Sequence, residues 1–260
     1  MLSIAIPSSA LINENDPKIK TFKVGLIGRA CAIFRVEEIL IYKDPLLDES
    51  DFIKDILEYM NTPQYLRKYL IPLKPTLRYA GVLPPLRIPS HKPKRLKIGE
   101  IRDGVIKQLT SNGTYLVDIG LDSLALLKSK SKLKKGERVT VRVCSRNPLI
   151  VKEAEPDDYW GFKVRKVKLN DLFKRKNIII TSKMCQVVSL DELRQSLKND
   201  ITLVFGSPKE DVFEIASRLG ININAKCWNT IPNQGVESVR LEEAIYITLG
   251  IVNIVRRWFG

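Results

Sequence analysis

Residues 228–250 read WNTIPNQGVESVRLEEAIYITLG, and this stretch decides how the end of the chain folds. It runs from an expected strand at 225–229, through a polar loop, into an expected helix at 241–259. That helix is apolar almost all round, which is typical of a helix buried in a core or a dimer interface. Wherever the loop backbone is buried it needs hydrogen-bond partners. The amides of Asn233 and Gln234 could supply those partners or could face a ligand.

A second turn has the same character. Residues 203–211 read LVFGSPKED, where an expected strand at 201–205 reaches Gly206 and a helix is expected at 209–219. Backbone N–H groups at such a turn can hold a polar ligand beside the carboxyl ends of parallel strands. A purely structural role stays open, because most turns of this kind bind nothing.

The rest of the α/β pattern lies at both ends of the chain. The expected elements are strands at 2–6, 38–42 and 178–180, and helices at 17–36, at 51–70 and from Ser189 onward. Pro63 is expected to break the helix at 51–70, because proline removes a backbone donor and clashes with the preceding turn. Between 71 and 93 prolines recur, which predicts an extended segment.

The middle of the chain has a different pattern. Residues 98–151 alternate between apolar and polar in short runs, with turns at 111–113 and 134–136. This pattern resembles an OB- or S1-type barrel, a small fold that commonly grips single-stranded nucleic acid. We therefore expect an α/β domain at 1–90 and 160–260, interrupted by an inserted all-β barrel at 94–158.

The formal charge of the 260-residue chain is +14, from 43 Lys and Arg against 29 Asp and Glu. Such an excess favours a polyanionic partner, although a solvated lysine-rich surface would give the same count. Tyr115, Tyr159 and Trp160 are candidates for stacking on bases, with core packing favoured for Tyr115. The basic residues expected to track phosphates are Lys94, Arg95, Lys97, Lys128, Lys130, Lys132, Lys134, Lys135, Lys163, Arg165 and Lys166.

The sequence gives no sign of a metal site or a membrane segment. The four cysteines are far apart and His91 is the only histidine, so we expect no zinc and read the cysteines as buried apolar residues in a reducing compartment. No apolar run approaches the roughly 20 residues that span a bilayer, and the first residues lack a basic signal region. A cytoplasmic protein is expected. A catalytic role for His91 is disfavoured by its proline-rich surroundings.

Five motifs together carry a family resemblance: GRACAIFRVEEILIY (28–42), RYAGVLPPLRIPSHK (78–92), GFKVR (161–165), LVFGSP (203–208) and NTIPNQGVESVRLEEAIYITLG (229–250). They resemble the SPOUT, or trefoil-knot, class of RNA methyltransferases. The nearest likeness is to the archaeal and eukaryotic subfamily of RNA uridine-N3 methyltransferases with an OB-like insertion. The resemblance implies a trefoil-knotted α/β domain, with the last helix threaded through a loop, and a homodimer. Because true knots are rare, the hydrophobic pattern could not have indicated one.

The same resemblance implies S-adenosylmethionine as cofactor and rRNA or tRNA as substrate. Methyl transfer requires donor and acceptor to be held in line and a proton to leave the acceptor. Arg29 is the first catalytic candidate, followed by Arg240 and Glu243, although each could equally be an exposed helix charge. The expected cofactor-binding residues are Val204, Phe205, Gly206, Ser207, Pro208, Trp228, Asn229, Thr230, Ile231, Pro232, Asn233, Gln234, Gly235, Val239 and Ala244.

Other interpretations remain at this point. Uridine N3 rests on the resemblance alone, so a ribose 2′-hydroxyl stays open as the methylated atom. An RNA-binding or ribosome-associated protein with a degenerate knot would keep the fold without the activity. A Rossmann-type nucleotide enzyme is disfavoured, since neither G-x-G-x-x-G after the first strand nor G-x-x-x-x-G-K-[ST] is present. A DNA-binding protein is disfavoured by the lack of a helix-turn-helix or zinc pattern.

Overall fold

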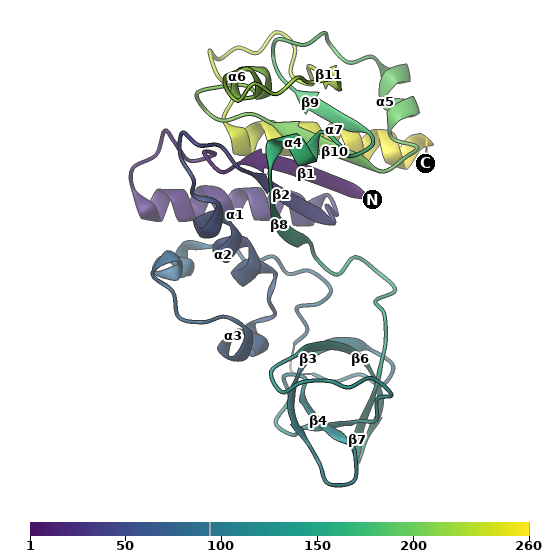
Figure 1. Ribbon diagram of the computed structural model, residues 1–260. Coiled ribbons are helices and arrows are strands. Elements are labelled where there is room, and N and C mark those ends of the chain that lie inside the picture. Colours follow the sequence, from purple (N-terminus) through teal and green to yellow (C-terminus); the bar gives the residue numbers. More distant parts are fainter. Residues whose placement is uncertain (94, 260) are drawn as a thin grey trace. The chain divides into compact units, whose positions relative to one another are not determined.

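The computed structural model describes residues 1–93 and 95–259 and divides into two compact units (Figure 1). The α/β unit contains Met1–Glu58, Thr76–Pro85 and Phe162–Gly260, and the barrel unit contains Tyr59–Pro75 and Leu86–Gly161. The sequence-based division had assigned 59–75 to the α/β domain. This segment lies with the barrel because the Tyr65 hydroxyl donates to the Asp103 carbonyl oxygen at 2.9 Å.

The α/β unit is built on a six-stranded sheet in the order β11-β9-β10-β1-β2-β8, in which every described strand pair is parallel. Its central strand, β1, pairs with β2 on one side and β10 on the other. Continuous apolar runs such as Ile178–Ile180 form these strands, because both faces of the sheet are covered. The bounds are β1 Leu2–Pro7, β2 Glu38–Tyr42, β8 Lys163–Val167, β9 Ile178–Thr181, β10 Ile201–Phe205 and β11 Lys226–Trp228.

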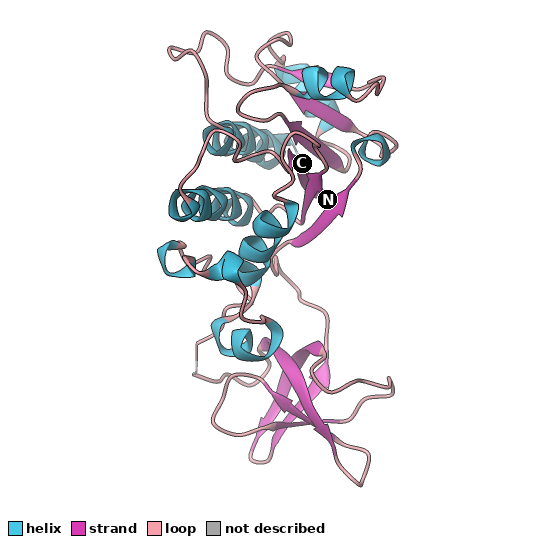
Figure 2. Cartoon of the chain, turned by 60° about the vertical axis from the view of Figure 1, so that its left-hand side comes forward, coloured by secondary structure: helices cyan, strands magenta, loops and turns pink. Residues whose placement is uncertain are grey.

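Helices cover both faces of this sheet (Figure 2). On one face Leu40 and Val204 pack in a cluster with Leu172 of α4 and Ile215 of α6. Alternate strand residues point to the other face, where α1 and α7 lie against each other. The bounds are α1 Pro17–Ile33, α2 Ser50–Asn61, α4 Leu169–Leu172, α5 Leu190–Ser196, α6 Val212–Arg218 and α7 Leu241–Phe259.

Several element boundaries differ from the sequence-based expectation. The break at Pro63 is confirmed, since α2 ends at Asn61 and α3 spans Gln64–Leu70. The helix expected from 209 begins only at Val212, because Asp211 caps it: the Asp211 carboxylate accepts from the Glu214 amide at 2.9 Å, and the Glu214 carboxylate accepts from the Asp211 amide at 2.7 Å. The proline-rich segment is largely irregular and carries two short 3-10 turns, η1 Pro75–Leu77 and η2 Ala80–Val82.

The barrel unit contains a closed five-stranded barrel in the order β3-β4-β5-β7-β6. Val117, Val141 and Val151 point inward and form its core with Tyr115, as expected for that tyrosine. Both predicted turns are present, and each holds a glycine at positive φ: Gly113 at 77° and Gly136 at 85°. The strands are β3 Ile101–Leu109, β4 Tyr115–Asp118, β5 Ala125–Leu127, β6 Arg138–Arg146 and β7 Leu149–Glu153. Within the described residues, no helix has the length and apolar character needed to cross a membrane.

Candidate functional site

A cavity of about 720 Å³ opens at the carboxyl ends of β9, β10 and β11. Because the strands are parallel, the loops that follow them emerge at the same edge of the sheet. Residues 181–184, 205–211 and 228–231 line the cavity from these three loops, and α7 closes it with Ala244 and Thr248. The cavity volume lies within the range of pockets that hold small molecules, about 300–1,000 Å³.

The loop after β10 folds back tightly on itself. The Ser207 amide donates to the Glu210 carbonyl oxygen at 2.8 Å. A Cβ atom at Gly206 would lie 2.8 Å from both the Asp211 Cα and the Glu210 carbonyl oxygen, closer than side chains tolerate. Only glycine therefore fits at the start of this loop.

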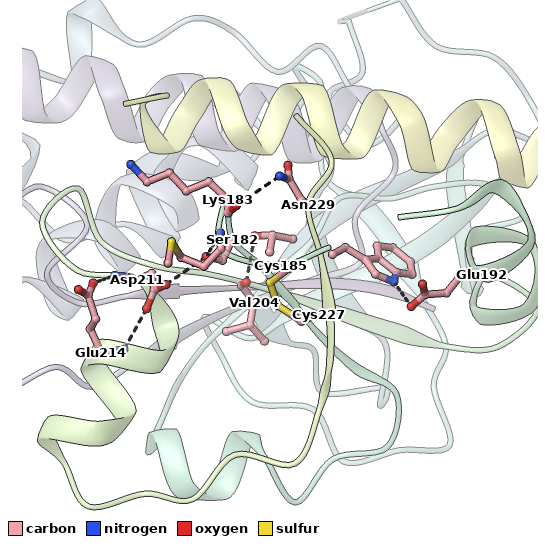
Figure 3. The surroundings of a disulfide bond; sticks show 12 residues. Ser182, Lys183, Cys185, Glu192, Val204, Asp211, Glu214, Cys227 and Asn229 are labelled. Carbon is pink, nitrogen blue, oxygen red and sulfur yellow. Dashed lines mark hydrogen bonds between the residues drawn. A yellow bond between two sulfur atoms is a disulfide. The ribbon is translucent and has the colours of Figure 1, made fainter. Parts of the chain in front are cut away.

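The loops after β9 and β11 are tied together by main-chain hydrogen bonds. The Ser182 amide donates to the Trp228 carbonyl oxygen at 3.1 Å, and the Asn229 amide donates to the Gln186 carbonyl oxygen at 3.0 Å. The Ser182 hydroxyl also donates to the Asp211 carboxylate at 3.1 Å, which connects this pair to the loop after β10 (Figure 3). The three loops thus form one hydrogen-bonded unit.

The floor of the cavity is fixed by buried groups on β11 and α7. The Trp228 side chain is fully buried, and its indole N–H donates to the Glu192 carboxylate at 2.8 Å. The hydroxyls of Thr230 and Thr248 share a buried hydrogen bond of 2.8 Å. Each of these buried polar groups therefore has a hydrogen-bond partner, as buried groups require.

Arg218 connects the cavity to the end of β2. Its guanidinium donates to Asp44 at 2.9 Å and to Glu210, which lines the cavity, at 2.6 Å. Burial alone would raise the pKa of the Asp44 carboxyl, but hydrogen bonds from Ser9 and Arg218 outweigh it and hold that pKa below its usual value. Asp44 therefore stays ionised at neutral pH and anchors Arg218 against the loop.

The cavity lining lacks the positive excess of the whole chain. Glu210, Asp211 and Glu214 contribute three carboxylates, against the two ammonium groups of Lys183 and Lys209. The chain as a whole carries a net charge of +14. Because Arg218 pairs with Glu210, the charges at the cavity are close to balanced and give it no excess of positive charge that would favour phosphates.

Most of the predicted cofactor-binding residues lie together in this cavity. Val204, Pro232, Asn233 and Gly235 are not part of its described lining, since Val204 is buried inside β10 and the other three are exposed. The predicted set missed 181–184, 209–211, Phe213, Glu214, Ser238, Leu241 and Thr248. The apolar run Ile178–Ile180 followed by Thr181 and Ser182 was a detectable signal, because polar residues after a parallel strand belong to the same edge. The predicted residues that line the cavity are Phe205, Gly206, Ser207, Pro208, Trp228, Asn229, Thr230, Ile231, Gln234, Val239 and Ala244.

The three catalytic candidates lie outside the described lining. Arg29 is half-buried on α1 and donates from Nη1 to the Pro85 carbonyl oxygen at 2.9 Å. Arg240 and Glu243 are exposed at the start of α7, where the Glu243 carboxylate accepts from the Arg240 amide at 3.0 Å. Glu243 thus has a capping role at the helix N-terminus.

The predicted RNA-binding residues that the structure describes are all exposed. Lys94 lies outside the described residues. Lys166 pairs with Asp51 at 2.8 Å, and Arg165 pairs with Glu38 at 3.3 Å. The barrel group surrounds the connection from β5 to β6 and consists of Lys128, Lys130, Lys132, Lys134 and Lys135.

Two aromatic candidates for base stacking have structural roles. Tyr159 is buried, and the Trp160 indole N–H donates to the buried Asp103 carboxylate at 3.0 Å. His91 lies in the same unit, with Nε2 at 3.4 Å from the Asn61 carbonyl oxygen. Burial lowers the pKa of His91 below its usual value, so this imidazole is neutral at pH 7.

The expectation of four isolated, buried cysteines is wrong for three of them. Cys185 and Cys227 form a disulfide although 42 positions separate them, because the loop after β9 lies beside β11 (Figure 3). Cys144 is exposed, and only Cys31 is a buried free thiol. Across the described residues, no group of three or more His, Cys, Asp or Glu side chains is arranged to hold a metal ion.

Comparison with known proteins identifies the class. A family described as "Putative RNA methyltransferase" matches residues 1–252. An uncharacterized protein of Halobacterium salinarum is 33% identical, over 97% of this chain and 98% of its own length. The 28S rRNA (uridine-N(3))-methyltransferases of Homo sapiens and Drosophila melanogaster are each 28% identical over 95% of this chain, and the matches cover 76% and 61% of those proteins. The chain belongs to this family of RNA methyltransferases.

Proposed function

We propose that this chain transfers the methyl group of S-adenosylmethionine to N3 of a uridine in RNA, with rRNA as the first substrate class to test. The observation that carries the proposal is the cavity of about 720 Å³ at the carboxyl ends of β9, β10 and β11. The human and fly relatives, which are 28S rRNA (uridine-N(3))-methyltransferases, suggest the atom and the RNA class.

The cavity lining fits the charge pattern of S-adenosylmethionine. This molecule carries a sulfonium, an ammonium and one carboxylate, and the lining supplies groups of both signs: the carboxylates of Asp211 and Glu214 and the ammonium groups of Lys183 and Lys209. Met184 and Phe213, which are exposed in the lining, offer apolar surface to the adenine ring. Lys183 at the rim is suited to pair with the carboxylate of the ligand. The α/β unit is, in this proposal, a trefoil-knotted SPOUT domain in which the last helix, α7, is threaded through a loop.

The reaction requires loss of the N3 proton of uridine and attack of that nitrogen on the methyl carbon. S-adenosylmethionine, when bound, supplies an electrophilic methyl group on sulfur. The chain has to orient the base and exclude water. The candidates for contacting RNA at this step remain Arg29, Arg240 and Glu243. None of the three belongs to the described lining of the cavity.

A homodimer is part of the proposal. Along α1, residues Ile19, Phe22, Leu26 and Ile33 recur at three- and four-residue spacing, as do Ile247, Ile251, Ile254 and Trp258 along α7. Most of these side chains are exposed. Because α1 and α7 are neighbours, their stripes form an apolar surface suited to a second copy. Arg29 and Glu243 lie on the same stripes, which would bring them to the dimer interface.

The barrel unit is proposed as the RNA-capturing part, as an OB- or S1-type fold. Its support is the exposed lysine group of the β5–β6 connection, together with Arg95 and Lys97. Ammonium groups on a loop can contact successive phosphates of a single strand without reading its sequence.

The first experiment is a calorimetric titration of the purified protein with S-adenosylmethionine. We expect micromolar affinity, about 8 kcal/mol, at one molecule per chain. Lys183→Ala should weaken binding about tenfold, whereas Lys198→Ala, which removes the same charge from an exposed position outside the cavity, should not. Absence of binding to folded protein would refute the cofactor assignment.

The methylated atom is tested by transfer of a labelled methyl group to rRNA, followed by digestion to nucleosides. The expected product is 3-methyluridine. A label on the ribose would refute the N3 assignment while leaving the methyltransferase intact. A label only with tRNA as acceptor would change the substrate class.

A further inference from the structure

Cys185 and Cys227 cross-link two walls of the cavity (Figure 3). Cys185 directly follows the lining residues 182–184 in the loop after β9, and Cys227 directly precedes Trp228 on β11. Their Cα atoms are 5.6 Å apart, a separation typical of disulfides. The covalent bond therefore joins the segment that forms one side of the cavity to the strand that forms its floor.

We propose that the Cys185–Cys227 pair is a redox-modification site that sets the affinity of the cavity for its ligand. The proposal rests on the proposed function, with S-adenosylmethionine as that ligand. In the oxidising direction, the two thiols lose two protons and two electrons and form the S–S bond, while a low-molecular-weight disulfide takes up those electrons and protons and becomes two thiols. A low-molecular-weight dithiol reverses the step and is itself oxidised to a disulfide.

The disulfide affects ligand affinity by keeping the loop after β9 ordered. Without it, the segment 182–188 is held to β11 by hydrogen bonds alone, such as that from the Asn229 amide to Gln186 and that from the Asn229 side-chain amide to Lys183 at 3.3 Å. Met184, at the rim, is strongly exposed. In the dithiol form the ligand has to order this segment when it binds, and ordering one or two side chains weakens binding by roughly three- to tenfold.

Both sulfur atoms are placed for such chemistry. Cys185 and Cys227 are each only partly buried, so a small thiol or disulfide can reach the pair. Cys31, by contrast, is fully buried, and burial raises the pKa of its thiol well above the usual value, which makes it unreactive in the folded chain. Cys144 is exposed and is the one cysteine of the barrel unit, so it is replaced by serine in the measurements below.

The first measurement counts thiols. The Cys144→Ser variant is used, because it cannot form a mixed disulfide at position 144. This protein is incubated with a low-molecular-weight disulfide, denatured and alkylated, and its mass is then determined. We expect one alkylated thiol, from Cys31, and three after prior reduction with a phosphine. Three alkylated thiols before reduction would overturn the proposal.

The second measurement is the calorimetric titration with S-adenosylmethionine, on oxidised and reduced Cys144→Ser protein. The oxidised form should bind three- to tenfold more tightly. Cys185→Ser and Cys227→Ser should each bind like the reduced form and lose the redox response, with far-UV circular dichroism confirming that they fold. Equal affinity of the two forms would refute this inference alone, whereas binding by neither would refute the proposed function as well.

Discussion

Replacing Gly206 by alanine should distort the cavity. The new Cβ would lie 2.8 Å from two backbone atoms of the returning loop, and ordinary contact begins at 3.4 Å. The turn at Ser207–Glu210 must therefore move by about 0.6 Å, the difference between these two distances. Overpacking of this kind costs about 1–3 kcal/mol. Because the same turn lines the cavity, we expect S-adenosylmethionine to bind about tenfold more weakly, which corresponds to about 1.4 kcal/mol.

Two alanine variants are matched controls for Gly206→Ala. A Cβ at Gly81 or at Gly235 meets no atom within 4 Å, and neither residue has a positive φ. Gly81→Ala should leave both the free energy of unfolding and ligand affinity unchanged within about 0.5 kcal/mol. Gly235→Ala, in the loop after β11, should leave affinity unchanged as well. Urea unfolding and calorimetry supply both quantities, and wild-type affinity in Gly206→Ala would refute the view that this tight turn shapes the site.

Three further predictions test other parts of the molecule. Since hydrogen bonds keep the folded-state pKa of Asp44 low, its contribution to stability is present above about pH 4 and is lost as the pH falls through that lowered pKa. In Arg218→Ala the folded-state pKa of Asp44 rises, so this loss of stability should begin at a higher pH. Urea unfolding from pH 3 to 7 measures the difference. Lys130→Gln with Lys132→Gln should lower the slope of log affinity for single-stranded RNA against log salt by about 1.4, and an unchanged slope would exclude these lysines from the phosphate track. Ile254→Asp should yield a monomer in sedimentation equilibrium; a dimer would refute the proposed interface on α1 and α7.

The disulfide also makes a measurable contribution to stability. It closes a loop of 42 positions, so in the chain-entropy description its reduction should lower the free energy of unfolding by about 4 kcal/mol. Urea unfolding of Cys144→Ser protein with and without a phosphine measures the difference. A change below about 1 kcal/mol would mean that the loop after β9 is already held in place by its hydrogen bonds.

The sequence was most informative where burial imposes a long pattern. The strand at Glu38–Tyr42 and the helix at Leu241–Phe259 were predicted with the bounds that the structure has, because uninterrupted apolar runs leave few alternatives. The loops at 205–208 and 228–231 were also found, since polar residues after buried strands indicate the ligand edge of a parallel sheet.

Long-range placement could not be predicted in the same way. β8, with the sequence KVRKV, was missed because it is an edge strand whose exposed cations hide a strand pattern. Nothing local in the sequence indicates that Cys185 meets Cys227, since their proximity depends on β11 pairing with β9. The roles of Arg29, Arg240 and Glu243 remain predictions, because they depend on RNA and on a second copy of the chain.

The position of β1 has a consequence for how the protein is made. β1 acquires β2 as a neighbour early, but its other neighbour, β10, begins only at Ile201. At ribosomal rates of about 5–20 residues per second, one edge of β1 stays without its partner strand for about 10–40 s. The barrel strands pair with near neighbours in the sequence and can fold during this interval. We expect nascent chains to depend on a chaperone that shields this edge until β10 has emerged.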